Sequence, residues 1–307
     1  MNNIISYYYD LNPDEIIYKN NNYYFSYLNS NYVFFLYDRP LEDIDELYKL
    51  NRLMIDRKLL VHKMVINKDK KLLTSVNNKY YVLLEVYVNN LGINLIDITN
   101  INNGTYLKNY NNLLNRTNWD ILWENKIDYY EEQIGEISEK YPLLISLINY
   151  YIGLSENAIL YYKYAKKITD DAFVSVCNKR IRFNDDLFSL YNPLNYIYDY
   201  RVRDVAEYTK SLFMNDKDAL TIIKEYINMN NLSYKELLLL YSRLLFPSYF
   251  FDLYDDIVNN NLDEELIIKI TSKSIEYESF LNDVYNYISG LYNKYIPKID
   301  WIIKRSY

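Results

Sequence analysis

The chain has 307 residues, of which 50% are hydrophobic and 24% charged, and it carries a formal net charge of −7. This length suits two domains or one two-lobed domain, and the composition excludes a disordered chain, which would have far fewer aliphatic and aromatic residues. The acidic balance argues against a protein that binds nucleic acid through a basic surface, and the best candidate for a local basic patch is Lys179, Arg180 and Arg182.

Cysteine content and hydropathy narrow the class of protein further. The single cysteine, Cys177, excludes an intrachain disulfide framework and is typical of a reducing compartment. With only one histidine beside it, we expect no zinc site. The N-terminus lacks a basic start followed by an apolar run, so we expect no signal peptide. The longest apolar stretches, such as Leu237–Leu240, are too short to span a membrane, and we expect a soluble protein without a membrane span.

Short aromatic and β-branched runs alternate with Asn-rich turns over the first ninety residues. This pattern predicts three strands, one helix and three more strands, which together form a small antiparallel sheet crossed by one helix. The helix is expected at Leu41–Leu60, because apolar residues recur there at helical spacing and acidic residues fill its first turn. The strands are expected at Asp14–Lys19, Tyr23–Leu28, Tyr32–Tyr37, Lys63–Ile66, Leu72–Val76 and Tyr80–Val88.

From about Ile93 the pattern becomes helical. The stretch Asp170–Tyr200 interrupts it with short Val, Ile and Phe runs, which predict small strands around a functional or formerly functional loop. Ser233 and Glu236 have the spacing of a capping box before an apolar run that Pro247 ends. The helices are expected at Trp119–Lys140, Leu143–Tyr151, Glu156–Tyr164, Val205–Leu212, Asp218–Met229, Leu237–Phe246 and Asp263–Tyr295.

A small lobe of sheet and helix followed by a larger helical lobe is the order of a protein-kinase-like phosphotransferase. We therefore predict an α+β, two-lobed, kinase-like fold. The N-terminal lobe is expected at residues 1–88 and the helical C-terminal lobe at residues 89–307. Because architecture alone is weak evidence for activity, the residues at the catalytic positions have to decide it.

Three segments carry a resemblance to a known family: Asn149–Tyr161, Tyr198–Tyr208 and Leu244–Phe251. They resemble the spore-coat branch of the aminoglycoside-phosphotransferase-like kinases, and within its CotS group the YutH type. The resemblance extends over nearly the whole chain and is most specific from Trp119 to Asp256. It implies a kinase-like fold and a link to endospore formation.

The nucleotide-binding positions of such a kinase are altered in this sequence. An active enzyme needs a lysine on the third strand to hold the nucleotide phosphates and a helix glutamate to orient that lysine. The lysine position falls near Leu36 or Tyr37, neither of which carries a positive charge, while Glu46 or Glu42 would be the glutamate. The turn that covers the phosphates should bear glycine, but here it reads Lys-Asn-Asn-Asn.

The catalytic loop is altered as well. In active relatives it reads His-Gly-Asp-x-x-x-x-Asn, and the matching stretch here is Val176–Leu187. The resemblance places Asn178 at the histidine, Arg180 at the catalytic aspartate and Asp185 at the metal-binding asparagine. Arginine stays protonated at any biological pH, so Arg180 cannot accept the proton of a substrate hydroxyl. Since the base and the lysine are both lost, we expect a pseudokinase without catalytic residues.

The resemblance retains one metal-binding aspartate, Asp199, on the strand that follows the loop. Asp199 is thus the vestigial nucleotide and metal position, and Asp185 is the possible second metal ligand. One carboxylate alone is a poor magnesium site. We therefore expect no cofactor, and ATP with magnesium only if the chain is an active enzyme. An aspartate between strand and turn commonly caps backbone amides, which is the structural alternative for Asp199.

Several other conspicuous residues are expected to be structural. His62 adjoins apolar residues and lies far in sequence from the loop, so we expect a packing histidine rather than a catalyst. Cys177 lies in an apolar strand, where a small core residue is expected rather than a nucleophile. Trp119 and Trp123 lie one helical turn apart and are expected to be core residues.

The sequence and the resemblance together imply a catalytically inactive spore-coat or sporulation protein that acts by binding or assembly. Its partners would be other spore-coat or sporulation proteins, and its location the mother-cell cytoplasm, the spore coat or both. One alternative is an atypical ATP-dependent phosphotransferase acting on a small molecule or a coat protein, with Asp185 or Asp186 as base. Another is a binding protein whose altered cleft holds a different ligand. Arg180 and Arg182 suit either a phosphate or acidic partner, or a salt-bridged loop.

Overall fold

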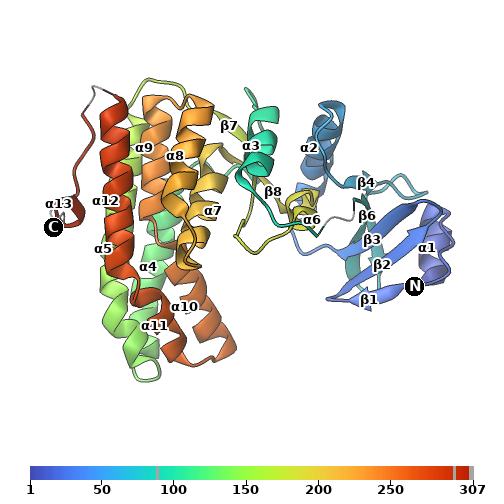
Figure 1. The fold of residues 1–307 in the computed structure, drawn as a ribbon. Coiled ribbons are helices and arrows are strands. Elements are labelled where there is room, and N and C mark those ends of the chain that lie inside the picture. Colours follow the sequence, from blue (N-terminus) through green and yellow to red (C-terminus); the bar gives the residue numbers. More distant parts are fainter. Residues whose placement is uncertain (88–89, 293–294, 304–307) are drawn as a thin grey trace. The chain divides into compact units, whose positions relative to one another are not determined.

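The computed structural model describes residues 1–87, 90–292 and 295–303, and it divides into two compact units (Figure 1). Unit 1 comprises Met1–Asn115, Ser175–Arg180 and Asn184–Tyr198. Unit 2 comprises Arg116–Val174, Ile181–Phe183 and the described residues from Asp199 onward. The lobe boundary expected between residues 88 and 89 lies outside the described residues.

The sheet of unit 1 confirms the predicted order of three strands, one helix and three strands. Every strand pairing in it is antiparallel, in the order β1-β2-β3-β6-β4, and β5 also pairs with β6. The predicted α+β fold class is therefore confirmed. The elements are α1 (Asn2–Tyr9), β1 (Ile17–Lys19), β2 (Asn22–Tyr27), β3 (Ser30–Leu36), a 3₁₀ turn (Leu41–Asp43), α2 (Ile44–Asp56), β4 (Lys63–Val65), β5 (Leu73–Val76) and β6 (Lys79–Val86).

Asparagine pairs close two of the hairpins in this sheet. Asn77 and Asn78, between β5 and β6, both have positive φ values, 49° and 60°. Asn20 and Asn21, between β1 and β2, have φ values of 51° and 61°. Two successive positive φ values match the right-handed twist of the flanking strands, and asparagine tolerates them better than most residues. The Asn-rich stretches that the sequence marked as turns are therefore turns for a steric reason.

Helix α1 was not predicted, and it covers one face of the sheet. Ile5 is fully buried in a cluster with Phe25, Phe34 and other sheet residues. The Tyr9 hydroxyl lies 2.7 Å from Oγ1 of Thr74 on β5. The Asn- and Tyr-rich segment has low helix propensity, so burial against the sheet, rather than propensity, stabilises this helix.

His62 is a buried packing residue, as expected. Its Nδ1 accepts a hydrogen bond from the Tyr87 amide at 3.3 Å, so its Nε2 carries the proton and donates to the Phe188 carbonyl at 3.0 Å. Only the neutral ring can make both contacts at once. Protonation would place an N–H on Nδ1, which could then no longer accept from the Tyr87 amide. Burial lowers the pKa of His62 from 6.5 to about 4, although the Phe188 carbonyl opposes this shift.

This lowered pKa predicts a loss of stability in mild acid. The unfolded chain binds a proton at His62 near pH 6.5 and the folded chain only near pH 4, so stability falls as pH drops through this window. The expected contribution is about 2 kcal/mol between about pH 7 and pH 5. Because the chain has one histidine, a proton NMR titration reports its pKa directly. In His62→Gln this part of the pH dependence should vanish; a folded-state pKa near 6.5 would contradict the prediction.

The remaining part of the chain is mostly helical, as predicted, with a small two-stranded sheet, β7 (Val174–Asn178) and β8 (Tyr196–Tyr200), inside the predicted loop region. Unit 1 adds α3 (Leu95–Gly104), α6 (Leu187–Leu190) and 3₁₀ turns at Asn112–Leu114 and Pro193–Asn195. Unit 2 contains α4 (Trp119–Ile137), α5 (Pro142–Lys166), α7 (Val202–Met214), α8 (Ala219–Asn230), α9 (Tyr234–Leu245), α10 (Ser248–Asn260), a 3₁₀ turn (Glu264–Ile267), α11 (Ile268–Thr271), α12 (Ser274–Leu291) and α13 (Asp300–Ile303).

Two predicted helix boundaries in unit 2 are wrong, and one helix was not predicted. Leu143–Tyr151 and Glu156–Tyr164 form the single helix α5, because Gly153 is tolerated inside a helix at modest cost. The helix expected at Asp263–Tyr295 is broken, since the Asp263 carboxylate caps a separate 3₁₀ turn. Helix α10 was not predicted, although its start directly after Pro247 agrees with the predicted end of α9.

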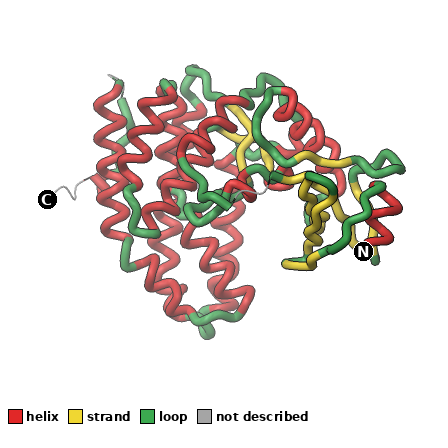
Figure 2. The backbone as a smooth tube through the Cα atoms, turned by 45° about the vertical axis from the view of Figure 1, so that its right-hand side comes forward, coloured by secondary structure: helices red, strands yellow, loops and turns green. Residues whose placement is uncertain are grey.

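Unit 2 is built mostly of helices, which are drawn in red in Figure 2. Helices α5 and α9 form its centre. Helix α5 packs against α4 and α9, and α9 packs also against α7 and α12. The Ser242 hydroxyl of α9 donates to the Ala158 carbonyl of α5 at 2.8 Å. In the described part of the chain, α5 alone is long and apolar enough to cross a membrane by length and composition, a criterion that core helices of soluble proteins also meet.

Candidate functional site

The residues at the expected catalytic loop fall in both units. Asn178 ends β7 and is buried, and the following amide, that of Lys179, donates to the Asn195 carbonyl at 2.8 Å. Arg180, at the expected position of the catalytic base, is exposed. Arg182 belongs to unit 2, where it forms an exposed ion pair of 3.4 Å with Asp252. The loop therefore presents an exposed guanidinium group at the position where the sequence analysis expects the catalytic base.

The two alternative bases have different surroundings in unit 1. The carboxylate of Asp186 accepts a hydrogen bond from the Ser189 amide at 2.8 Å and so caps α6. Asp185 is partly exposed, and its backbone carbonyl accepts from the Ile93 amide at 3.2 Å. The Asp186 side chain therefore stabilises the start of α6. The position of Asp185 is fixed by the hydrogen bond of its backbone carbonyl.

Asp199 is fully buried at the end of β8, in unit 2. Both of its carboxylate oxygens accept hydrogen bonds from the indole Nε1 of Trp119, at 2.9 and 3.1 Å. The guanidinium Nε of Arg203 lies 3.0 Å from Oδ2, and the Tyr200 amide donates to Oδ1 at 2.8 Å. The carboxylate therefore accepts hydrogen bonds from an indole, a guanidinium and a backbone amide. All three are hydrogen-bond donors, and none of them can serve as a metal ligand.

The electrostatics of Asp199 reflect two opposing effects. Burial away from water raises its pKa from 3.8 to about 6, and the nearby guanidinium groups of Arg203 and Arg243 limit the rise. A magnesium ion would have to bind beside these positive charges, so the surroundings of this carboxylate do not fit a magnesium ligand. In the described residues no group of three or more His, Cys, Asp and Glu side chains is placed to hold a metal ion.

A second buried ionic cluster adjoins this site in unit 2, and the sequence did not predict it. The carboxylate of Glu207 accepts from Lys210 Nζ at 2.8 Å, from Arg243 Nε at 2.6 Å and from the Ser248 hydroxyl at 2.7 Å. Lys210 also donates to the carbonyls of Arg243 and Phe246. This arrangement gives the Glu207 carboxylate three donors and the Lys210 ammonium several acceptors.

Burial and charge pairing act against each other in this cluster, and the pKa values of both Glu207 and Lys210 are lowered. Burial opposes ionisation of Glu207, but Lys210 and Arg243 outweigh burial and hold the pKa of this carboxyl well below its usual range. Burial lowers the pKa of Lys210 to about 8, with Glu207 acting in the opposite direction. The guanidinium of Arg243 lies 5.0 Å from the centroid of the Trp119 ring. Trp119 therefore connects the cluster to Asp199.

Two signals in the sequence could have found this cluster. Glu207 and Lys210 have the (i, i+3) spacing of neighbours on one helix face, and Arg243 interrupts an otherwise apolar run. Trp119 and Trp123 are buried, as expected, and the Trp123 ring stacks on Phe246 with a centroid distance of 4.5 Å. The additional role of Trp119 as a hydrogen-bond donor was not predicted.

In unit 1, the residues at the expected lysine and glutamate positions make other contacts. Leu36 packs against the apolar cluster beneath α1, and the Tyr37 hydroxyl donates to the Pro40 carbonyl at 2.8 Å. The buried Glu46 accepts from the Tyr198 hydroxyl at 2.7 Å, and Lys49 of the same helix lies 3.2 Å away. Glu46 is therefore held by a tyrosine and by its own helix rather than by a strand lysine.

Comparison with known sequences gives the family. The family model described as "Spore coat putative kinase YutH" matches residues 2–284. The endospore coat-associated protein YutH of Bacillus subtilis (strain 168) is 27% identical over 214 residues, which cover 61% of this chain. The matched region spans 62% of the length of that relative.

Comparison with solved structures confirms the kinase-like fold. An aminoglycoside phosphotransferase from Alicyclobacillus acidocaldarius superposes with a TM-score of 0.61 and 11% identity, covering 94% of this chain and 96% of that one. Spectinomycin phosphotransferase gives a TM-score of 0.56 at 11% identity, covering 95% and 94% of the two chains. A sequence identity of 11% to these two structures supports the fold alone. The family is given by the family model, which matches most of the sequence. The chain therefore belongs to the YutH family of spore coat proteins.

Proposed function

We propose that this chain is a catalytically inactive, kinase-like component of the spore coat that acts by binding and assembly rather than by phosphoryl transfer. The observation that carries the proposal is the arrangement around Asp199. Its carboxylate is fully buried and bound by the Trp119 indole and the Arg203 guanidinium. A magnesium ion at this carboxylate would meet a fixed positive charge 3.0 Å from one oxygen, and like charges repel.

The loop residues support the proposal independently. Phosphoryl transfer depends on positioning and on charge stabilisation, with a carboxylate to accept the proton of the attacking hydroxyl. Arg180 stands at that position and cannot act as a base. Asp186, one of the two bases open to an active enzyme, caps α6. The atypical phosphotransferase would then depend on Asp185.

The nucleotide-binding positions of unit 1 support it in turn. No positively charged side chain occurs on β3, whose sequence is Ser-Asn-Tyr-Val-Phe-Phe-Leu. Glu46, which would orient a strand lysine, is bound instead by the Tyr198 hydroxyl. The electrostatic clamp for the phosphates therefore lacks its cation, and we expect neither ATP nor magnesium as a cofactor.

The partners that we propose are other spore-coat or sporulation proteins, met in the mother-cell cytoplasm, in the assembling coat or in both. Family membership supports this placement, because the family is one of spore coat proteins. A protein that acts by assembly binds its partners through its surface and needs no catalytic residues in the loop Val176–Leu187. Substitutions in the loop should consequently leave its function intact.

This expectation is tested by complementing a deletion of the gene in its native host with Arg180→Ala. Arg180 is exposed, so the substitution should leave the fold unchanged. We expect coat assembly equal to that of the wild type and of a matched control, Arg52→Ala, which removes an exposed arginine from α2. The variant that separates the two functions is Asp185→Asn, because an active phosphotransferase would depend on Asp185 as its base. A coat defect in Asp185→Asn alone, with unchanged thermal melting of the purified variant, would overturn the proposal.

A further inference from the structure

Strand β1 forms an edge of the sheet in unit 1, and all three of its residues, Ile17, Tyr18 and Lys19, are exposed. It pairs with β2 on one side, and no other strand among the described residues pairs with its other side (Figure 1). The side chains of Ile17 and Tyr18 are 56% and 59% exposed. An edge strand with exposed apolar side chains is a template for pairing with another strand.

The sequence around this edge is complementary to itself. Residues 15–19 read Glu-Ile-Ile-Tyr-Lys. If a second copy of the strand pairs with it in antiparallel orientation, centred on Ile17, Glu15 of each copy lies opposite Lys19 of the other. The same register places Ile16 opposite Tyr18. We propose that β1 is a homodimerisation edge, at which two copies of this chain join their sheets around Ile17.

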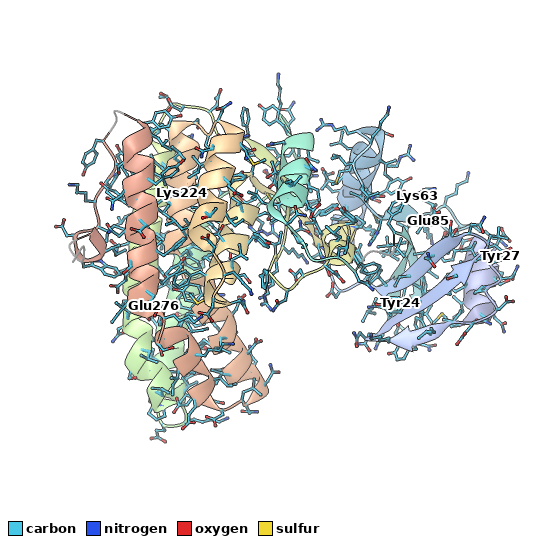
Figure 3. All side chains as sticks on the ribbon, viewed as in Figure 1. Tyr24, Tyr27, Lys63, Glu85, Lys224 and Glu276 are labelled. Atoms are coloured by element: carbon cyan, nitrogen blue, oxygen red, sulfur yellow. The ribbon has the colours of Figure 1, made fainter. Side chains whose placement is uncertain are left out.

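The register of the sheet supports this pairing. Ile17 lies opposite Tyr24, Tyr24 opposite Val33, and Val33 opposite Leu84, so a single row of apolar side chains crosses the sheet on one face. Tyr24 is labelled in Figure 3. A second copy would continue this row with its own Ile17, because residues directly opposite in an antiparallel pair lie on the same face.

The other face has a matching row. Tyr18 lies opposite Tyr23, and Tyr23 opposite Phe34. The ring centroids of Tyr18 and Tyr23 are 4.8 Å apart. In the proposed register Ile16 of the second copy adds to this row beside Tyr18. Both faces of the sheet would therefore continue across the dimer interface without a mismatch of polar and apolar residues.

The far edge of the same sheet already contains a charge pair of the proposed kind. Lys63 on β4 lies directly opposite Glu85 on β6, with 3.5 Å between Nζ and Oε2 (Figure 3). Opposite charges in this position stabilise strand pairing, and like charges weaken it. Pairing centred on Ile17 forms two such pairs, whereas a shift of the register by one residue forms none between these side chains, since it places Glu15 opposite Tyr18 or Asn20.

The strand is short, so the dimer should be weak and should depend on protein concentration. A cysteine at the symmetry centre detects such a dimer, because Ile17→Cys would place the two thiols directly opposite each other, within reach of a disulfide. The native Cys177 is fully buried and does not interfere. We expect Ile17→Cys to form a disulfide-linked dimer under mild oxidation faster than Tyr7→Cys, a control at a residue that is 67% exposed.

Charge reversal tests the register itself. Glu15→Lys and Lys19→Glu each turn both attractive pairs into repulsive ones, so each should weaken the dimer roughly tenfold or more in analytical ultracentrifugation. The double swap Glu15→Lys/Lys19→Glu should restore it, and a mixture of the two single variants should form a heterodimer. The proposal is overturned if Ile17→Cys and Tyr7→Cys cross-link at the same rate, or if the double swap dissociates like the single variants.

Discussion

Replacement of Glu207 by alanine will lower the free energy of unfolding by about 3–5 kcal/mol, because it leaves buried positive charges without their counterion. Lys210 is 2% exposed, and Glu207 supplies the carboxylate nearest to its Nζ and to the Arg243 guanidinium. In the variant these two cations face each other across the space that the carboxylate occupied. The loss should appear as a lower urea midpoint in circular dichroism.

The matched control for this experiment is Glu225→Ala, which removes an exposed glutamate from the neighbouring helix α8. Surface substitutions of this kind change stability by about 0.5 kcal/mol or less. Glu207→Gln keeps the shape of the side chain but not its charge, and should fall between the two. If Glu207→Ala unfolds at the same urea concentration as Glu225→Ala, the ionic cluster around Glu207 does not stabilise unit 2.

Loss of the Trp119 indole will have the second large effect. Trp119→Ala should cost about 3–5 kcal/mol, because it removes a fully buried aromatic side chain. Trp119→Phe keeps most of the packing but removes the N–H that both Asp199 oxygens accept, which should cost about 1–3 kcal/mol. Chemical denaturation of the two variants measures both losses.

Trp123→Phe is the control that separates packing from hydrogen bonding. Trp123 lies on the same helix and is buried, and it stacks on Phe246. The excess loss in Trp119→Phe over Trp123→Phe therefore reports the hydrogen bond to Asp199. An equal loss in both variants would mean that this hydrogen bond does not stabilise the buried carboxylate.

The fold could be predicted from the sequence where local pattern and final packing agree. The strands of unit 1 follow from alternating aromatic and β-branched residues, and the Asn-rich turns mark their ends. Helix α1 was missed because its stability comes from burial of Ile5 against the sheet, which no local pattern shows. Helix α5 was divided at Gly153, a residue that lowers helix propensity without forcing a break.

The candidate site was predictable only in part, for a similar reason. Asn178, Arg180, Asp185 and Asp199 could be named because a family pattern fixes their spacing along the chain. What Asp199 contacts could not be predicted, since Trp119 lies 80 residues before it in sequence. A contact between elements that lie far apart in sequence, such as α4 and β8, depends on the packing of the whole unit. No local sequence pattern indicates it.

The proposed inactivity agrees with the energetics of the buried groups. The carboxylate of Asp199 is stabilised by Arg203 at 3.0 Å, and breaking such a buried pair is costly. Metal binding would have to compensate for this cost before any nucleotide could be held. The ion pair between Arg203 and Asp199 therefore favours the closed interior over an arrangement in which Asp199 binds a metal ion.

Nucleotide binding by the purified chain tests the central claim most directly. A ligand that binds the folded state at ten times its Kd adds about 1.4 kcal/mol, which raises the melting temperature of a chain this size by about 2–4 °C. We predict no shift with millimolar ATP and magnesium or manganese, in the wild type or in Asp199→Asn. A metal-dependent rise in the wild type that is lost in Asp199→Asn would contradict the account and favour an active phosphotransferase.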